Sequence, residues 1–173
     1  MAHILLVTGG ARSGKSQFAL QTLEACLPKA FIATCVAMDI EMVERIARHK
    51  TERGSEWYTI EEPTDLASAI RAIPQGVNGV VIDCLTVWLG NLMHQYGEDV
   101  DIFPYLDDVC DALNAFDGTA ALVTNEVGVG IVPLGTYTRR FRDLAGWISQ
   151  RIAKEAAQVV LMVAGYPIYA KGA

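Results

Sequence analysis

The residues whose types and spacing point most directly to chemistry form a glycine-rich run, Gly9-x-x-x-x-Gly14-Lys15-Ser16. Glycines let backbone N–H groups turn inward toward phosphate oxygens, because no Cβ stands in the way. A helix beginning at this loop points its positive end at the bound anion. Lys15 can then reach the β- and γ-phosphates and Ser16 can bind Mg²⁺, so the run predicts a nucleoside triphosphate site. The alternative is a Gly-rich turn that matches the template by chance.

A second candidate is Asp83, which ends the apolar run GVVID at residues 79–83. An acid after a buried strand can hold Mg²⁺ through water beside a phosphate loop. Alone, Asp83 would be better interpreted as a strand-end residue that caps the next segment. Beside residues 9–16 we favour the metal role.

The third candidate is His49. Arg45, His49 and Arg53 are four residues apart and therefore lie along one side of the helix expected there, with Arg48 and Lys50 next to the histidine. Nearby cations disfavour the imidazolium, keep the ring nucleophilic near pH 7 and attract polyphosphate. Such a histidine can attack the α-phosphate of a nucleoside triphosphate and form a nucleotidyl-enzyme. Composition alone favours the other interpretation, a surface histidine among solvated charges.

The elements that must position these residues alternate along the chain. Short apolar runs predict strands, and segments of helical periodicity separate them. Unbroken apolar strands indicate a mainly parallel sheet covered by helices on both faces, an α/β fold of the P-loop nucleoside triphosphate hydrolase type. The strands are expected at residues 3–7, 30–34, 57–60, 79–83, 120–124 and 159–164; the helices at 14–26, 39–54, 64–72, 87–95, 103–116 and 138–157. Ligands bind at the carboxyl ends of such strands, where Thr8, Gly9, Thr34, Asp83, Asn125 and Glu126 fall.

Length and composition set the outer limits. The 173 residues suit a single domain, residues 1–173, and 51% of them are hydrophobic. The net charge of −6 argues against a nucleic-acid partner. No apolar run approaches the roughly 20 residues of a membrane span, no signal peptide is visible, and the four cysteines match no zinc spacing. We therefore expect a cytoplasmic protein with reduced thiols.

Several classes of phosphate-loop protein can be set aside. A GTPase usually carries an N-K-x-D base-reading motif, and the nearest run here, TNEV at residues 124–127, lacks the Lys and the Asp. Signatures of RecA-type and transporter ATPases are also missing from the sequence. A small-molecule kinase or a nucleotidyltransferase remains.

At this point the sequence resembles a known family, the bifunctional adenosylcobinamide kinases/adenosylcobinamide-phosphate guanylyltransferases of cobalamin synthesis. Four blocks carry the resemblance and together span nearly the whole chain. They are VTGGARSGKS at residues 7–16, FIATC…D-x-E-M…RI-x-x-HK at 31–50, W-x-T-x-E at 57–61, and VTNEVGVGIVP followed by RRFRDLAG at 123–146. The last block is the most distinctive.

The resemblance implies two reactions. The hydroxyl on the aminopropanol arm of adenosylcobinamide is phosphorylated by ATP or GTP, and GTP then donates GMP to that phosphate through a guanylylated His49. Lys15 is the second implied catalytic residue, and Ser16 and Asp83 are the implied Mg²⁺ ligands. Nucleotide contacts by similarity are Gly9, Gly10, Ala11, Arg12, Ser13, Gly14, Lys15, Ser16, Thr34, Cys35, Val36, Lys50, Thr51, Glu52, Arg53, Glu61 and Asp83.

The resemblance also implies a homotrimer with the substrate site between subunits. Two positions depart from the family pattern. Arg48 stands where some members have a first histidine before His49, and Asp83 stands where members often have Glu.

Some alternatives stay open. Asn125 and Glu126 can orient a hydroxyl or water, or they can form a turn held by side-chain hydrogen bonds. Arg139, Arg140 and Arg142 can approach a phosphate or a neighbouring subunit, or form a solvated face that includes an Arg139–Asp143 pair. The chain as a whole can be a single-activity kinase in which His49 is not catalytic, or a binding protein that hydrolyses nucleotide slowly.

Overall fold

The computed structural model describes residues 2–35 and 56–172. The predicted helix at residues 39–54, with His49, lies outside the described residues. The elements are β1 (His3–Gly9), α1 (Lys15–Thr22), β2 (Lys29–Ala33), β3 (Trp57–Glu61), α3 (Leu66–Arg71), β4 (Gly79–Asp83), α4 (Leu85–Tyr96), α5 (Phe103–Ala115), β5 (Thr119–Val123), α6 (Thr136–Glu155), β6 (Gln158–Val163) and β7 (Tyr166–Lys171).

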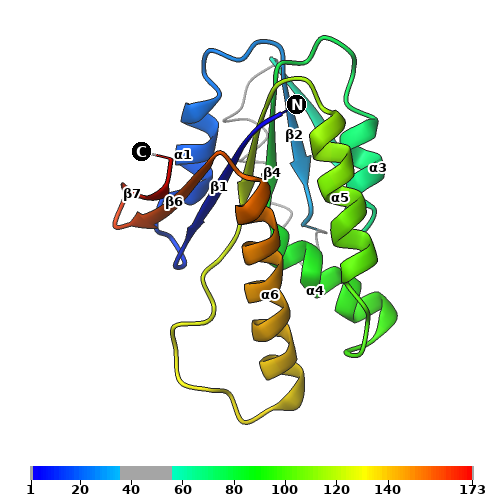
Figure 1. Cartoon of the computed structure of the whole chain (residues 1–173), viewed down its shortest axis with the longest axis vertical. Coiled ribbons are helices and arrows are strands. Elements are labelled where there is room, and N and C mark those ends of the chain that lie inside the picture. Colours follow the sequence, from blue (N-terminus) through cyan, green and yellow to red (C-terminus); the bar gives the residue numbers. More distant parts are fainter. Residues whose placement is uncertain (1, 36–55, 173) are drawn as a thin grey trace, which may run out of the picture.

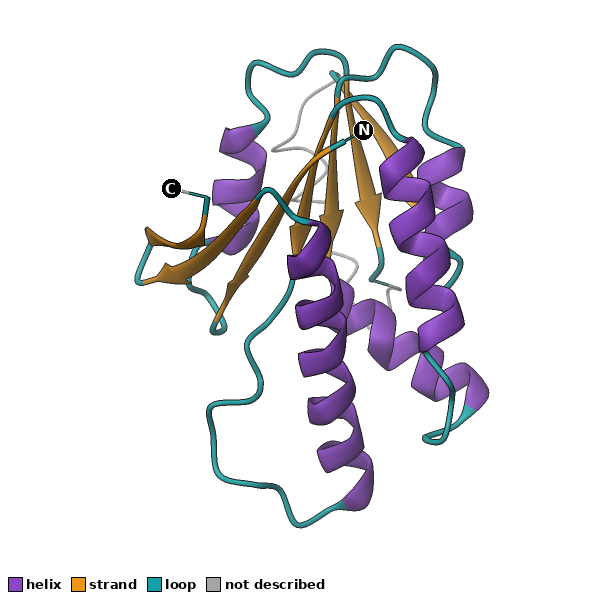
Figure 2. Ribbon diagram, viewed as in Figure 1, coloured by secondary structure: helices purple, strands orange, loops and turns teal. Residues whose placement is uncertain are grey.

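Within the described residues the strands form one seven-stranded sheet in the order β3-β2-β4-β5-β1-β6-β7 (Figures 1 and 2). The pairs from β3 to β6 are all parallel, as the unbroken apolar strands predict. The register aligns Ala33 with Asp83, and Asp83 with Val123. The polar residues that follow these strands therefore lie side by side at the carboxyl ends of the strands. The parallel sheet covered by helices confirms the predicted α/β class.

Helices cover both faces of the sheet, and each face has its own hydrophobic core. Alternate strand residues such as Leu5 and Val81 pack with Ala19 and Leu23 beneath α1. Their neighbours, such as Ile4 and Ile82, face the larger core formed with α3, α4, α5 and α6. Burial on both sides explains why these strands contain almost no polar residues.

The C-terminal hairpin is an element that the sequence analysis missed. Strand β7 runs antiparallel to β6 and forms an exposed edge of the sheet, after a tight turn at Ala164 and Gly165. Both turn residues have positive φ, 50° and 88°, the geometry of two-residue hairpin turns. The Ala-Gly pair between two β-rich runs was the available signal, weaker than the Asn-Gly or Asp-Gly that such turns usually carry.

Helix α1 is shorter than the predicted segment 14–26 and ends at Thr22. The chain then tightens into turns, in which the amides of Leu23 and Cys26 donate to the carbonyls of Leu20 and Leu23. The turn presses Cys26 against Gly79, where an added Cβ would lie 2.8 Å from the Cys26 Cβ. Packing against the start of β4 thus ends the helix before Pro28. No helix of residues 2–35 and 56–172 is both long and apolar enough to span a bilayer.

Candidate active site

The glycine-rich run forms the connection from β1 to α1, as the strand and helix around it predicted. Gly9 and Gly14 have φ of 150° and 95°, conformations that favour glycine. An added Cβ on Gly9 would lie 2.6 Å from the Met162 carbonyl oxygen and 2.7 Å from the Ser13 hydroxyl. Gly14 stands immediately before Lys15, the first residue of α1, so the loop sits at the helix N-terminus. This geometry suits anion binding by backbone N–H groups.

Lys15 points back into the loop. Its side chain is buried, and Nζ donates to the Gly10 carbonyl at 2.5 Å and lies 3.5 Å from the Ser13 hydroxyl. Burial lowers the pKa of the Lys15 ammonium, while the nearby Asp83 carboxylate and Cys84 raise it. Lys15 and Asp83, two residues far apart in sequence, are therefore electrostatic neighbours.

Next to this pair, a buried hydrogen-bonded network joins the ends of β2 and β4. The Thr34 hydroxyl donates to the Cys84 carbonyl at 2.9 Å and accepts from the Cys84 amide at 2.8 Å. Thr34 is 0% exposed. The Asn91 amide on α4 donates to the Thr34 carbonyl at 2.7 Å. Thr34, predicted as a nucleotide contact, thus commits its hydroxyl to the backbone that follows Asp83.

Asn125 and Glu126 extend this edge toward the phosphate loop. The Asn125 side chain donates to the Thr86 hydroxyl at 2.8 Å, in the first turn of α4. The Glu126 amide donates to the Gly9 carbonyl at 3.0 Å, and its carboxylate accepts from the Gly128 amide at 2.8 Å. The Glu126 carboxylate therefore holds a local turn, the second of the two interpretations that the sequence left open, whereas the Asn125 side chain links the residues after β5 to the first turn of α4.

The other predicted site residues separate into two groups. Glu61 ends β3 beside Ala33, which also pairs with Asp83, so Glu61 and Asp83 flank the end of β2. Cys35 follows Thr34 and is half-buried. Gly10, Ala11 and Arg12 are exposed along the loop, and Ser16 lies in the first turn of α1. The remaining predicted residues lie outside the described residues: Val36, His49, Lys50, Thr51, Glu52 and Arg53.

An apolar loop, not anticipated as a surface, connects β5 to α6. Five of its side chains are exposed, and Ile131 and Leu134 are each 97% exposed. Its members are Val127, Val129, Ile131, Val132 and Leu134. Arg139 on α6 donates to the carbonyls of Pro133 and Leu134, while Asp143 lies 3.7 Å from Arg142. The expected Arg139–Asp143 pair is therefore wrong, and Arg139 instead closes this loop, which stands away from the sheet in Figure 1.

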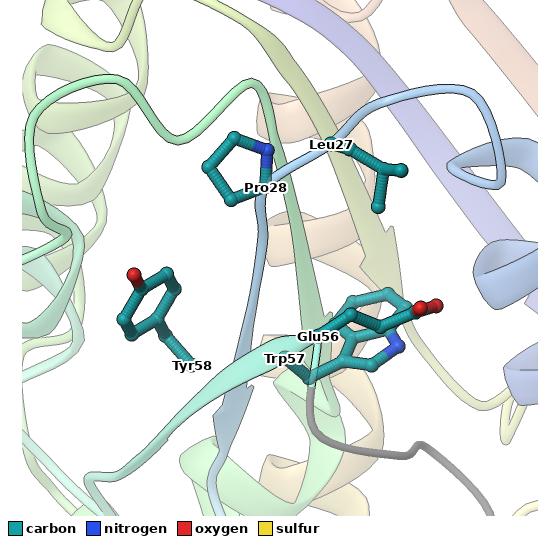
Figure 3. A pocket seen from close by; sticks show the side chains of 5 residues that line it. All are labelled: Leu27, Pro28, Glu56, Trp57 and Tyr58. Carbon is teal, nitrogen blue, oxygen red and sulfur yellow. The ribbon is translucent and has the colours of Figure 1, made fainter.

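A shallow pocket lies elsewhere on the molecule (Figure 3). It is lined by Leu27, Pro28, Glu56, Trp57 and Tyr58. These residues precede or begin β2 and β3, so the pocket lies at the amino ends of the parallel strands, away from the phosphate loop. Beneath it the buried Lys29 ammonium lies 3.1 Å from Glu56 and 4.9 Å from the Trp57 ring centre. The Glu56 carboxylate and the face of the Trp57 ring therefore both stabilise the buried Lys29 ammonium.

A phosphate loop and a neighbouring acid at the carboxyl edge of a parallel sheet define an α/β protein of the P-loop nucleotide-binding class. Solved structures agree on the fold. The RadB recombinase has a TM-score of 0.53 at 15% identity, covering 91% of this chain and 73% of that one. An ATPase from the type III secretion system of pathogenic bacteria has a TM-score of 0.54 at 13% identity, covering 92% of this chain and 50% of that one.

Sequence relatives narrow the class to a family. The family described as "Cobinamide kinase / cobinamide phosphate guanyltransferase" matches residues 5–170. The bifunctional adenosylcobalamin biosynthesis protein CobP of Pseudomonas aeruginosa is 40% identical, with 96% of each chain covered. The bifunctional adenosylcobalamin biosynthesis protein CobU of Escherichia coli K12 is 36% identical, covering 97% of this chain and 99% of its own. The chain belongs to the cobinamide kinase/cobinamide phosphate guanyltransferase family, which confirms the resemblance.

Proposed function

We propose that this chain performs both reactions for which its family is named, phosphorylating adenosylcobinamide with ATP or GTP and then joining GMP from GTP to the phosphate. The observation that carries the proposal is the family match across residues 5–170, which includes the phosphate loop and every strand of the site edge. We also propose that both reactions take place in the cytoplasm, as expected from the sequence.

In the kinase step, the substrate hydroxyl oxygen attacks the γ-phosphorus. The bond from that phosphorus to the bridging oxygen breaks, the nucleoside diphosphate leaves, and the hydroxyl proton passes to water. The loop from Gly9 to Ser16 binds the phosphates through its N–H groups, and Lys15 swings from the Gly10 carbonyl to the β- and γ-phosphates. The Ser16 hydroxyl and the Asp83 carboxylate are the hard oxygen donors that suit Mg²⁺. Bound Mg²⁺ would neutralise charge that develops on the phosphates.

In the transfer step, we assign the nucleophile to His49. A ring nitrogen attacks the α-phosphorus of GTP, and the bond to the bridging oxygen breaks, releasing pyrophosphate. A phosphate oxygen of the cobinamide phosphate then attacks the same phosphorus and frees the histidine. The support for this assignment is the cationic surroundings of His49 in the sequence, Arg45, Arg48, Lys50 and Arg53. The competing function is a single-activity kinase in which His49 is not catalytic.

The two functions differ in one measurement. The protein is incubated with Mg²⁺ and GTP labelled at the α-phosphate, and acid-labile label on the protein is counted. We expect label on the wild type and on His94→Ala, whose histidine is exposed on α4, and none on His49→Ala. His49→Ala should keep kinase turnover, whereas Lys15→Ala should weaken both reactions. Label that persists in His49→Ala excludes His49 as the guanylylated residue.

We also propose that the chain assembles as a homotrimer, with the apolar loop against a neighbouring copy. Side chains as exposed as Ile131 and Leu134 are unfavourable in water, and burying each contributes roughly 1.5–3 kcal/mol. Size-exclusion chromatography with light scattering tests the assembly. Ile131→Asp with Leu134→Asp should give monomers, while Leu27→Asp, an exposed residue at the amino ends of the parallel strands, should stay trimeric. A wild-type monomer would refute the proposal.

A further inference from the structure

The turn of the C-terminal hairpin lies directly against the phosphate loop. The Gly165 amide donates to the Ser13 carbonyl at 3.0 Å. An added Cβ on Gly14 would lie 3.3 Å from the Gly165 Cα. Residues separated by about 150 positions in the chain are thus in backbone contact, where the β6–β7 hairpin lies beside the connection from β1 to α1 (Figure 1).

The hydrogen bond acts on one peptide group of the loop. The Ser13 carbonyl and the Gly14 N–H belong to the same trans peptide, so they point in opposite directions. When the hairpin holds the carbonyl outward, the Gly14 N–H points to the inner side of the loop. If that peptide turned over, the carbonyl oxygen would face the phosphates and repel them. Gly14 permits such a turn because it lacks a Cβ, with φ at 95°.

The turn owes its shape to Gly165. Gly165 has φ of 88°, and an added Cβ would meet nothing within 4 Å. A side chain there would therefore strain the backbone without a steric clash. The turn is exposed. Its contact with Ser13 is a backbone hydrogen bond and buries little apolar surface, so the contact contributes little to the hydrophobic core.

We propose that Gly165 is a positioning residue for the nucleotide: its amide holds the Ser13–Gly14 peptide in the orientation that binds phosphate. The inference rests on the proposed nucleotide site at residues 9–16. A binding N–H to a charged acceptor contributes about 1.5–3 kcal/mol, so losing its orientation corresponds to a roughly ten- to hundredfold weaker Kd.

Gly76 supplies a matched control. It has φ of 89°, also meets nothing within 4 Å, and lies in the turn before β4, at the amino ends of the parallel strands, whereas the phosphate loop lies at their carboxyl ends. Gly165→Val and Gly76→Val should therefore impose similar strain and similar loss of thermal stability. Only Gly165→Val should weaken binding of tripolyphosphate, a probe without a base, by ten- to hundredfold in calorimetry. Gly165→Asn should restore binding, because Asn tolerates positive φ.

The outcomes separate the two levels of the proposal. If Gly165→Val and Gly76→Val bind tripolyphosphate equally, or if Asn does not rescue, the positioning role is refuted. If Lys15→Met binds tripolyphosphate as tightly as the wild type, the phosphate site itself is wrong. If either valine variant fails to fold, the milder pair Gly165→Ala and Gly76→Ala decides by the same comparison.

Discussion

Replacing Thr34 by valine tests whether this residue holds the site edge together. Valine keeps the shape of threonine but removes the hydroxyl that bridges both backbone groups of Cys84. The Cys84 carbonyl keeps a second partner, the Trp88 amide at 3.1 Å, whereas the Cys84 amide loses its acceptor. An unsatisfied buried amide costs about 1–3 kcal/mol, and the weakened carbonyl adds about 0.5–1 kcal/mol. We expect Thr34→Val to lower the free energy of unfolding by about 1.5–4 kcal/mol.

Thr34→Ser is the matched control. It keeps the hydroxyl and removes one buried methyl group, so the expected loss is about 1 kcal/mol. Urea unfolding followed by tryptophan fluorescence, at one protein concentration, measures both variants. A Thr34→Val protein within 0.5 kcal/mol of the wild type, on the order of an ordinary surface substitution, refutes the reasoning, as does a serine variant that is less stable than the valine variant.

Three further predictions concern Lys15, Asp83 and Arg139. Because burial lowers the pKa of Lys15 below its unfolded value of 10.5, the unfolded chain holds more protons between the two pKa values. Wild type should therefore gain stability relative to Lys15→Met as the pH rises toward 10.5, and a wild-type urea midpoint that falls relative to that of Lys15→Met contradicts this. Asp83→Asn removes a carboxylate that raises the Lys15 pKa and that we assign to Mg²⁺. The variant should therefore need a higher Mg²⁺ concentration for half-maximal kinase activity. An unchanged Mg²⁺ dependence excludes a metal role for Asp83. Arg139→Met should speed proteolysis within the apolar loop without changing the melting temperature, and cleavage no faster than in Arg142→Met would show that Arg139 does not close the loop.

Local patterns were enough to predict most of the strands. Runs such as GVVID at 79–83 are buried on both faces and look the same from the sequence and in the sheet. The phosphate loop was predictable for a related reason: the backbone conformations that require glycine at Gly9 and Gly14 arise within a run of eight residues. The neighbour relations of the strands follow from packing between distant segments, and no local signal gives them.

The misses have the same origin. The buried Lys29 lies just before the strand expected at residues 30–34, and the groups that compensate its charge, Glu56 and Trp57, come from the start of another strand. The sequence did not indicate that the apolar loop is exposed, because apolar residues ordinarily predict burial. Likewise Gly165 carries no motif, and its role depends on a hydrogen bond to Ser13 across the sheet edge.

The position of β1 has a consequence for how the protein is made. This first strand pairs with β5 and β6, so its partners begin at Thr119 and Gln158. A ribosome adds residues in order, and the N-terminal strand must wait for partners more than 100 positions later. The amide that donates to the Ser13 carbonyl comes from Gly165, which is synthesised later than both of these partner strands begin. The nucleotide loop is synthesised long before the contact that completes it, so tight nucleotide binding reports that the chain has folded as far as the β6–β7 hairpin.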